Sequence, residues 1–308
     1  MTKCWPLLLL LSGCSGQPAI APEGIVSNNP CVDGILAEIA APGQIAAVSV
    51  YSHNAAGASA PLAWSRALPA IGTSAEEVIA ARPRLLLTGN LAFGGTNAAL
   101  AKAGVKLHAY GVPATVSESL AQVRQIASVI NRQAQGEALV VRIEAAIKPL
   151  PSRGGVGVGV VGKSNSLSTA PTPNPVEPLG PVRGTDPSTP KEEGNLSAII
   201  WQGGGFVAGK GTLQDELLQR AGYRNASAAY GLKQWEQLPL ETLIRNPPDV
   251  IFMPMTGQGD AARELAARSK LLRHVSGKAR IVSFPDKLLF SGGPTIIEVM
   301  QVMKAGGS

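Results

Sequence analysis

Residues 157–164 read GVGVVGKS, and their spacing fits two nucleotide-binding motifs. Four variable residues separate Gly157 from Gly162-Lys163-Ser164, as in a P-loop, and the first six residues also fit the dinucleotide fingerprint. In such sites the backbone N–H groups of the loop and the start of the following helix surround the phosphates. The run therefore raises the question of a nucleotide-dependent enzyme.

The segment around this run is a poor scaffold for phosphate binding. A P-loop needs a strand before it and a helix directly after it, but the run is followed by NSLSTAPTPNPVEPLGPVRGTDPSTPKEEG, where prolines recur too often for a helix. Valine–glycine alternation in a biased segment matches short glycine motifs easily. We expect residues 151–194 to form a disordered insert rich in proline and glycine, so the motif carries no chemistry.

A second glycine-rich run, GGFVAGK at 204–210, lies between an apolar strand-like segment and an amphipathic helix-like segment. It has P-loop spacing, but Gly211 follows Lys210 where the Mg²⁺-holding serine or threonine belongs. We expect these glycines to allow a tight turn or a close approach of the backbone instead.

The first residues indicate where the protein works. MTKCWPLLLLLSGCSG combines a lysine, a short apolar run and small residues, as in a secretory signal peptide that is too short to span a bilayer. Leu11-Ser12-Gly13-Cys14 resembles the bacterial lipobox, so we expect a signal peptide over 1–14 with lipidation at Cys14; simple secretion is the alternative. Either predicts a periplasmic protein, bound to the membrane only through a lipid anchor, where ATP is absent.

Composition excludes several classes of protein. The net charge is +6 with 16% charged residues, and no basic stripe with interleaved aromatics appears, so no nucleic-acid partner is expected. Of three cysteines, Cys4 and Cys14 belong to the leader, which leaves Cys31 alone as a small packing residue at a helix start.

No Cys-x-x-Cys or His-x-x-x-His spacing occurs, so no metal site is expected. His53 is a lone histidine of the kind that more often hydrogen-bonds than ligates.

Two stretches of the chain share one order of predicted elements, in which apolar runs alternate with helical patterns. The segment SAEEVIAARPRLLL (74–87) aligns without gaps with PLETLIRNPPDVIF (239–252), which pairs Glu76 with Glu241. Such alternation implies parallel sheets covered by helices on both faces. We predict an α/β fold of two three-layer lobes, 24–131 and 195–308, with a helical stretch within 132–150 between them and a ligand cleft between the lobes.

Aromatic residues outside predicted cores are candidates for ligand contact, because only 4% of the residues are aromatic. Tyr51 directly follows an apolar strand, Trp235 lies in a polar turn, and Phe206 lies in the second glycine run. Aromatic rings at the ends of strands can cover a broad apolar ligand, although ordinary packing is the alternative for each.

The sequence resembles the periplasmic binding proteins that feed ABC importers of vitamin B12, haem and ferric siderophores. The resemblance runs from about Gly24 to Val302, interrupted by the insert. It is carried by the segments IVSNNPCVDGILAEI, VSVYS, AIGTSAEEVIAARPRLLLTG, GGFVAGKGTLQDELLQRAG, WEQLPLETLIRNPPDVIFM and SGGP.

The resemblance implies a bilobed clamp on one backbone helix, about 134–149, with small hinge motion. Tyr51, Phe206 and Trp235 fall where vitamin B12-binding members place aromatics against the ligand. A tryptophan of those members corresponds to Ala70, for which nearby Trp64 is a possible substitute.

The resemblance also assigns roles to polar positions. Ser291 and Gly292 match a glycine turn at the cleft mouth and are expected to contact ligand. Glu76 and Glu241 match the glutamates that meet arginines of the two permease subunits.

These observations predict a non-catalytic extracytoplasmic receptor without a cofactor of its own. Its cargo would be a metal chelate, cobalamin or a ferric siderophore, delivered to an inner-membrane ABC permease dimer with its ATPase. The alternatives are a lipoprotein enzyme or a partner-binding scaffold on the same fold. No serine elbow is visible, and three scattered histidines offer little for catalysis.

Overall fold

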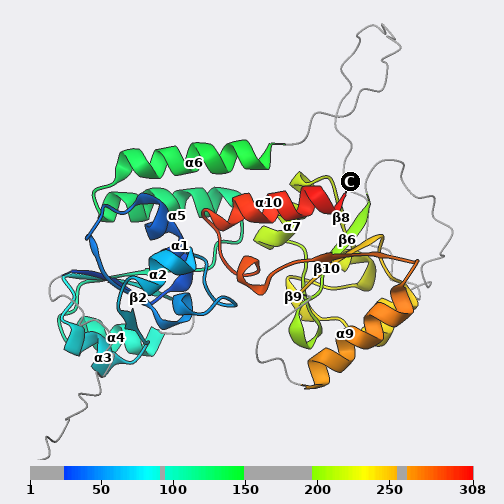
Figure 1. The fold of residues 1–308 in the computed structure, drawn as a ribbon, viewed down its shortest axis with the longest axis horizontal. Coiled ribbons are helices and arrows are strands. Elements are labelled where there is room, and N and C mark those ends of the chain that lie inside the picture. The colour runs from blue at the N-terminus through cyan, green and yellow to red at the C-terminus, as the bar shows by residue number, and fades with distance from the viewer. Residues whose placement is uncertain (1–23, 91–93, 149–195, 255–261, 308) are drawn as a thin grey trace, which may run out of the picture.

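The structure is a computed structural model that describes residues 24–90, 94–148, 196–254 and 262–307. Within these ranges it is a mixed α/β protein of two lobes (Figure 1). The predicted signal peptide with Cys14, the predicted insert 151–194 and the motif at 157–164 lie outside the described residues.

The first lobe is built on a five-stranded sheet in the order β3-β2-β1-β4-β5, with every pairing parallel. Alternate residues of its central strands enter two different cores: Ile25 and Leu87 face one side, and Val26 and Leu86 face the other. The strands therefore read as continuous apolar runs because both faces of the sheet are covered. The elements are β1 (Ile25–Ser27), β2 (Ile45–Ser49), β3 (Ala70–Ile71), β4 (Leu85–Gly89), β5 (Leu107–Tyr110), α1 (Pro30–Ile39), α2 (Leu62–Arg66), α3 (Ala75–Ala81), α4 (Gly94–Lys102) and α5 (Val116–Val129).

The second lobe has a parallel sheet in the order β11-β10-β6-β8 and a separate antiparallel ribbon of β7 and β9. Its strands also alternate between two cores, with Ile200 and Phe252 on one face and Ile199 and Ile251 on the other. The elements are β6 (Ser197–Ile200), β7 (Phe206–Ala208), β8 (Arg224–Asn225), β9 (Trp235–Gln237), β10 (Val250–Met253), β11 (Arg280–Ser283), α7 (Leu213–Arg220), α8 (Leu240–Arg245), α9 (Ala262–Val275) and α10 (Thr295–Gly306).

The two lobes repeat one topology. The strands β1, β4 and β5 are adjacent in the first sheet as β6, β10 and β11 are in the second, and α3 precedes β4 as α8 precedes β10. This arrangement confirms the predicted two-lobed α/β fold with parallel sheets. The β7–β9 ribbon was not predicted; its first strand, β7, lies in the second glycine-rich run.

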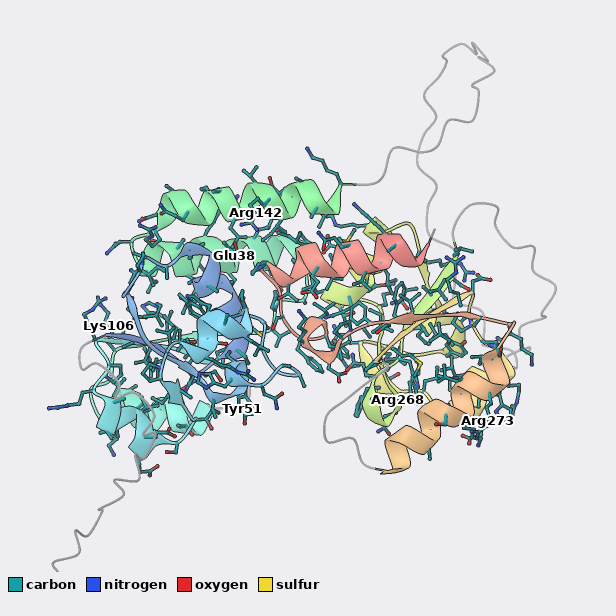
Figure 2. The ribbon with its side chains drawn as sticks, viewed as in Figure 1. Glu38, Tyr51, Lys106, Arg142, Arg268 and Arg273 are labelled. Carbon is teal, nitrogen blue, oxygen red and sulfur yellow. The ribbon has the colours of Figure 1, made fainter. Side chains whose placement is uncertain are left out.

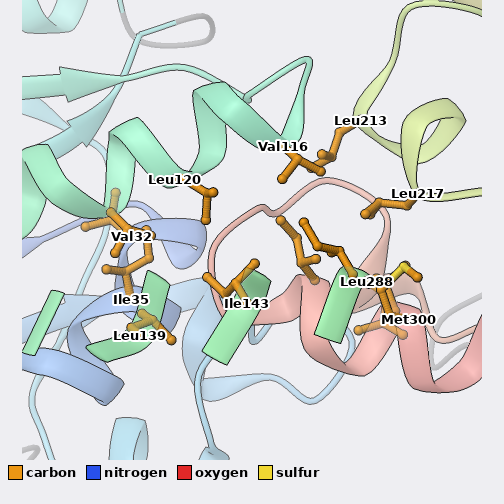
Figure 3. Close-up of a cluster of buried hydrophobic side chains, with 14 of the residues drawn as sticks. Val32, Ile35, Val116, Leu120, Leu139, Ile143, Leu213, Leu217, Leu288 and Met300 are labelled. Atoms are coloured by element: carbon orange, nitrogen blue, oxygen red, sulfur yellow. The ribbon is translucent and has the colours of Figure 1, made fainter. Parts of the chain in front are cut away.

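Helix α6 (Gln133–Ile147) packs against α5 and α1 of the first lobe and against α10 of the second (Figure 1). Its buried side chains belong to a hydrophobic core that extends without interruption into both lobes (Figure 3). The Lys304 ammonium also donates to the carbonyl oxygens of Ala146 and Lys148, at 2.8 and 2.9 Å. The exact domain boundaries stay a prediction, but α6 and the core make the lobes one packed body. Core residues labelled in Figure 3 are Val32, Ile35, Val116, Leu120, Leu139, Ile143, Leu213, Leu217, Leu288 and Met300.

Candidate functional site

Four exposed aromatic side chains, Tyr51, Phe206, Trp235 and Phe290, stand out among the described residues, and we call them the aromatic rim. Their exposed fractions are 54%, 44%, 38% and 51%. Tyr51 lies on the side of the first lobe that faces the second (Figure 2), and the other three belong to the second lobe. Rings of this size are usually buried unless a ligand or partner covers them.

The β7–β9 ribbon presents two of these rings together. Phe206 pairs with Gln237 and Ala208 pairs with Trp235, so Phe206 and Trp235 lie on one face as diagonal neighbours. Val207, on the opposite face, is fully buried and anchors the ribbon to the lobe. The ribbon therefore displays aromatic rings on one side because its other side is part of the core.

Phe290, which the sequence analysis missed, completes the second-lobe part of the rim. Its ring centroid lies 6.0 Å from that of Trp235, with 32° between the planes. It follows the 3₁₀ turn Asp286–Leu288, a segment whose pattern predicts no element. The low aromatic content of the chain was the signal that could have identified it.

The close approach of the two ribbon strands depends on Gly209. A methyl group added there would lie 1.5 Å from the carbonyl oxygen of Lys233 and 2.7 Å from its carbonyl carbon. Both are backbone atoms, which no side-chain rotation can move away. Only glycine allows the chain after β7 to lie against the chain before β9.

Tyr51 belongs to a 3₁₀ turn, Val50–His53, that directly follows β2. The strand ends at Ser49 because the carboxylate of Asp33 on α1 accepts hydrogen bonds from Ser49 N–H (2.9 Å) and from Ser52 Oγ (2.6 Å). Asp33 is fully buried. Desolvation raises its pKa from 3.8 to about 7, and hydrogen bonds from serines oppose that rise only in part.

The lobes meet directly beside the rim, at a seam formed by Cys31 and Ser59 of the first lobe and Ser291 of the second. Ser59 Oγ and Ser291 Oγ share a 2.7 Å hydrogen bond, Ser291 Oγ donates to the Cys31 thiol, and the thiol donates to the carbonyl of Phe290 at 3.7 Å. Desolvation raises the pKa of Cys31, so its thiol is protonated at neutral pH. We call these three residues the interlobe seam.

Ser291 and Gly292, expected to contact ligand, lie in this region of close packing. Ser291 is 4% exposed. A methyl group on Gly292 would lie 2.5 Å from Ser119 Oγ and 2.8 Å from Pro113 Cγ. The geometry gives both residues contacts between the lobes, and their contact with ligand stays a prediction.

Two further positions differ from the rim residues. Ala70 lies on the edge strand β3, and Trp64 on α2 is partly buried against the main core, so it does not extend the rim. The His53 ring nitrogen Nε2 lies 2.9 Å from the carbonyl oxygen of Ser65. Within the described ranges, histidine, cysteine and carboxylate side chains form no group of three that could hold a metal ion.

The sequence profile of a family described as periplasmic binding protein matches residues 25–153 and 185–276. The chain belongs to this family. Membership places the protein outside the cytoplasm and makes it a solute-binding protein, not an enzyme. A comparison with curated proteins found no match.

Solved structures with the same fold include several binding proteins. The periplasmic haem-binding protein RhuT from Roseiflexus sp. RS-1 is 19% identical, with a TM-score of 0.64 over 94% of this chain and 100% of its own. The periplasmic haem-binding protein HutB of Vibrio cholerae is 16% identical, with a TM-score of 0.62 over 92% and 98%. An ABC transporter substrate-binding protein from Listeria monocytogenes EGD-e is 10% identical, with a TM-score of 0.57 over 93% and 98%.

The two glutamates predicted to dock this periplasmic binding protein differ in their surroundings. Glu76 is exposed at the start of α3, and no hydrogen bond or ion pair of its side chain is found within the described residues. The neighbouring Glu77 is the capping residue, since its N–H donates to Ser74 Oγ and its carboxylate accepts from Gly72 N–H at 2.9 Å. Glu241, at the start of α8, pairs with Lys270 at 2.8 Å, which lowers its pKa.

The part of the chain that the structure describes contains no helix of the length and apolarity needed to cross a membrane.

Proposed function

We propose that the protein captures a flat metal chelate and delivers it to an ABC permease dimer driven by its ATPase. The observation that carries this proposal is the aromatic rim, which brings exposed rings from both lobes to the two sides of the interlobe seam. Broad apolar rings with few charged neighbours suit a macrocycle such as haem or cobalamin, or the apolar face of a ferric siderophore. The haem-binding proteins with the same fold support testing haem first.

The test of this function is a thermal-shift screen of the purified protein with hemin, cyanocobalamin, a ferric hydroxamate siderophore and molybdate. A ligand at one hundred times its Kd adds about 2.7 kcal/mol to the free energy of unfolding, which gives a clear shift. Stabilisation by a chelate, with the chelate recovered unchanged, supports the proposal. A response to molybdate alone, or to none of the four, contradicts it.

Replacing Trp235 by alanine is expected to weaken binding of the chelate by about 1–3 kcal/mol, because a covered indole loses its apolar contact area and its ring contacts. The chelate should also quench tryptophan fluorescence in the unmodified protein and quench it less in the variant. Fluorescence titration measures both effects.

The matched control is Val141→Ala, since Val141 is an exposed apolar residue on α6, outside the rim. Unchanged affinity in Trp235→Ala, or an equal loss in the control, would remove Trp235 from the site.

We propose that Glu76 and Glu241 dock the two lobes onto the two permease subunits. Replacing both by alanine is expected to leave chelate affinity unchanged and to weaken binding to the permease at least about tenfold, most visibly at low salt, because exposed charge pairs set docking rate and orientation and are screened as salt is added. Binding to the importer in detergent or nanodiscs, together with uptake by cells, measures this effect.

The control replaces Glu38 and Glu137, exposed glutamates that pair with Arg142 and Arg124 on other helices. Normal transport by the Glu76/Glu241 variant would show that these carboxylates only stabilise their helices.

A further inference from the structure

The Tyr51 ring is carried by the Val50–His53 turn, in which the side chains of Val50 and Tyr51 make no hydrogen bond within the described residues. Val50 and Tyr51 are both exposed, and β2 ends just before them. Within the turn, Tyr51 N–H donates to Ser49 Oγ at 3.3 Å, and Asn54 N–H donates to the Tyr51 carbonyl at 3.2 Å. These local bonds shape the turn but do not fix it to the lobe.

Two elements attach the turn to the lobe. On α2, Ser65 Oγ donates to the Ser52 carbonyl at 2.6 Å and Arg66 donates to the His53 carbonyl at 3.0 Å, and both bonds lie on the far side of Tyr51 from β2. From α1, the Asp33 carboxylate holds the segment on both sides of Tyr51. Oδ2 of Asp33 accepts from Ser49 N–H and from Ser52 Oγ, the residues on either side of Val50 and Tyr51. Above pH 7, where this carboxyl group is ionised, hydrogen bonds to it are roughly twice as strong as neutral ones. Asp33, in the first turn of α1, contacts residues on both sides of Tyr51, whereas the bonds from α2 reach only Ser52 and His53.

Burial of this carboxyl group is costly for the fold, so its position needs an explanation. Asp33 is fully buried, and its second oxygen Oδ1 has no hydrogen-bond partner within the described residues. An apolar residue would complete the packing of α1 without desolvating a charge. The two bonds to the Tyr51 segment are what the carboxylate supplies and an apolar side chain cannot.

We propose that Asp33 is a positioning residue that fixes the Ser49–Ser52 segment and so aims the Tyr51 ring at the cargo. This inference rests on the proposed role of Tyr51 in chelate capture. Cys31, protonated at neutral pH, is the titratable neighbour of Asp33 in the same turn. In the turn itself, His53 is engaged with the Ser65 carbonyl and Arg66 with the His53 carbonyl, while the donors to Asp33 are Ser49 N–H and Ser52 Oγ.

The second lobe provides a matched control for this arrangement. Oδ2 of Asp249 accepts from Ser197 N–H at 2.9 Å and from Ser197 Oγ at 2.7 Å. Like Asp33, it therefore accepts from one backbone N–H and one serine hydroxyl, at nearly the same distances. Asp249 precedes β10, at the amino ends of the strands, whereas Tyr51 follows the carboxyl end of β2. Loss of the Asp249 carboxylate should weaken the fold without affecting the Tyr51 segment.

The first experiment uses no ligand: backbone amide hydrogen exchange is compared in the unmodified protein, Asp33→Ala, Asp33→Asn and Asp249→Ala. Two lost hydrogen bonds to a charged acceptor should raise exchange of the 49–53 amides about tenfold or more in Asp33→Ala, relative to the 46–48 amides of β2. Asp33→Asn keeps an acceptor oxygen and should restore near-normal protection. Unchanged exchange in Asp33→Ala, or the same local rise in Asp249→Ala, would overturn the proposal.

The second experiment measures affinity for hemin and for cyanocobalamin. Asp33→Ala should weaken binding of whichever probe binds by about tenfold, Asp33→Asn should recover most of the loss, and Asp33→Ala should have no further effect in a Tyr51→Ala background. An equal loss with and without the Tyr51 ring would refute positioning.

The two experiments distinguish a wrong cargo class from a wrong role for Asp33. If neither probe binds, the proposed cargo class is wrong while the exchange experiment still decides the role of Asp33. If Asp33→Ala does not fold, Ser52→Ala removes the 2.6 Å bond alone and should give a smaller rise in exchange over the same residues.

Discussion

Replacing Asp33 by asparagine is expected to change the pH dependence of folding stability by about 4 kcal/mol. Burial raises the pKa of Asp33 from 3.8 to about 7, so the folded chain holds this proton more tightly than the unfolded chain. The stabilisation is complete below pH 3.8 and is lost as the pH rises through 7. The pKa differs by about three units between the folded and unfolded chain, and each unit is worth about 1.4 kcal/mol, which gives the expected change of about 4 kcal/mol.

Asparagine cannot ionise, so Asp33→Asn should lack this loss. Urea titrations at pH 4 and pH 8 give the free energy of unfolding of each protein. Between these two pH values the wild type should lose about 4 kcal/mol more than the variant. Any constant penalty for the buried amide cancels in that comparison. Parallel pH profiles of the two proteins would show that Asp33 titrates near its ordinary pKa and is not held in a dry site.

Replacing Gly209 by alanine is expected to cost about 3 kcal/mol of folding stability, at the upper end for an overpacked site. The added methyl would lie 1.5 Å from the Lys233 carbonyl oxygen, so the chain segments on either side must separate. The separation should displace β9 and with it Trp235. Affinity for a chelate should therefore fall together with stability.

Gly95→Ala is the matched control, because Gly95 lies in the first turn of α4 with no atom within 4 Å of the added methyl. Urea unfolding followed by circular dichroism measures both variants. A loss below about 1 kcal/mol in Gly209→Ala would mean that the strands accommodate the methyl group, and it would contradict the claim that their close approach requires glycine at this position.

The repeated part of the fold could be predicted from the sequence because each lobe repeats it locally. The segments 74–87 and 239–252 combine a helix start, a proline and an apolar run, and these features act within a few residues of one another. Parallel sheets buried on both faces then follow from the unbroken apolar runs at β1, β4, β6 and β10.

The site was less predictable because its contacts join residues far apart in the chain. The apolar pattern around β2 does not indicate that Asp33, from a helix that precedes it, bonds to Ser49 where the strand ends. Nothing in the local pattern indicates that Cys31 meets Ser291 across the lobes. Phe290 likewise becomes a candidate only when Trp235 is found beside it.

The core that runs through both lobes also affects when the protein can fold. The apolar faces of α6 and α7 are completed by α10, which follows every other described element in the chain. During synthesis the parts of α6 and α7 that contact α10 stay uncovered until residues 295–306 have emerged, so the shared core closes last. A protein that works beyond the cytoplasmic membrane must first cross it, and an unfinished core keeps the chain in a loose, translocatable state until nearly all of it has been made.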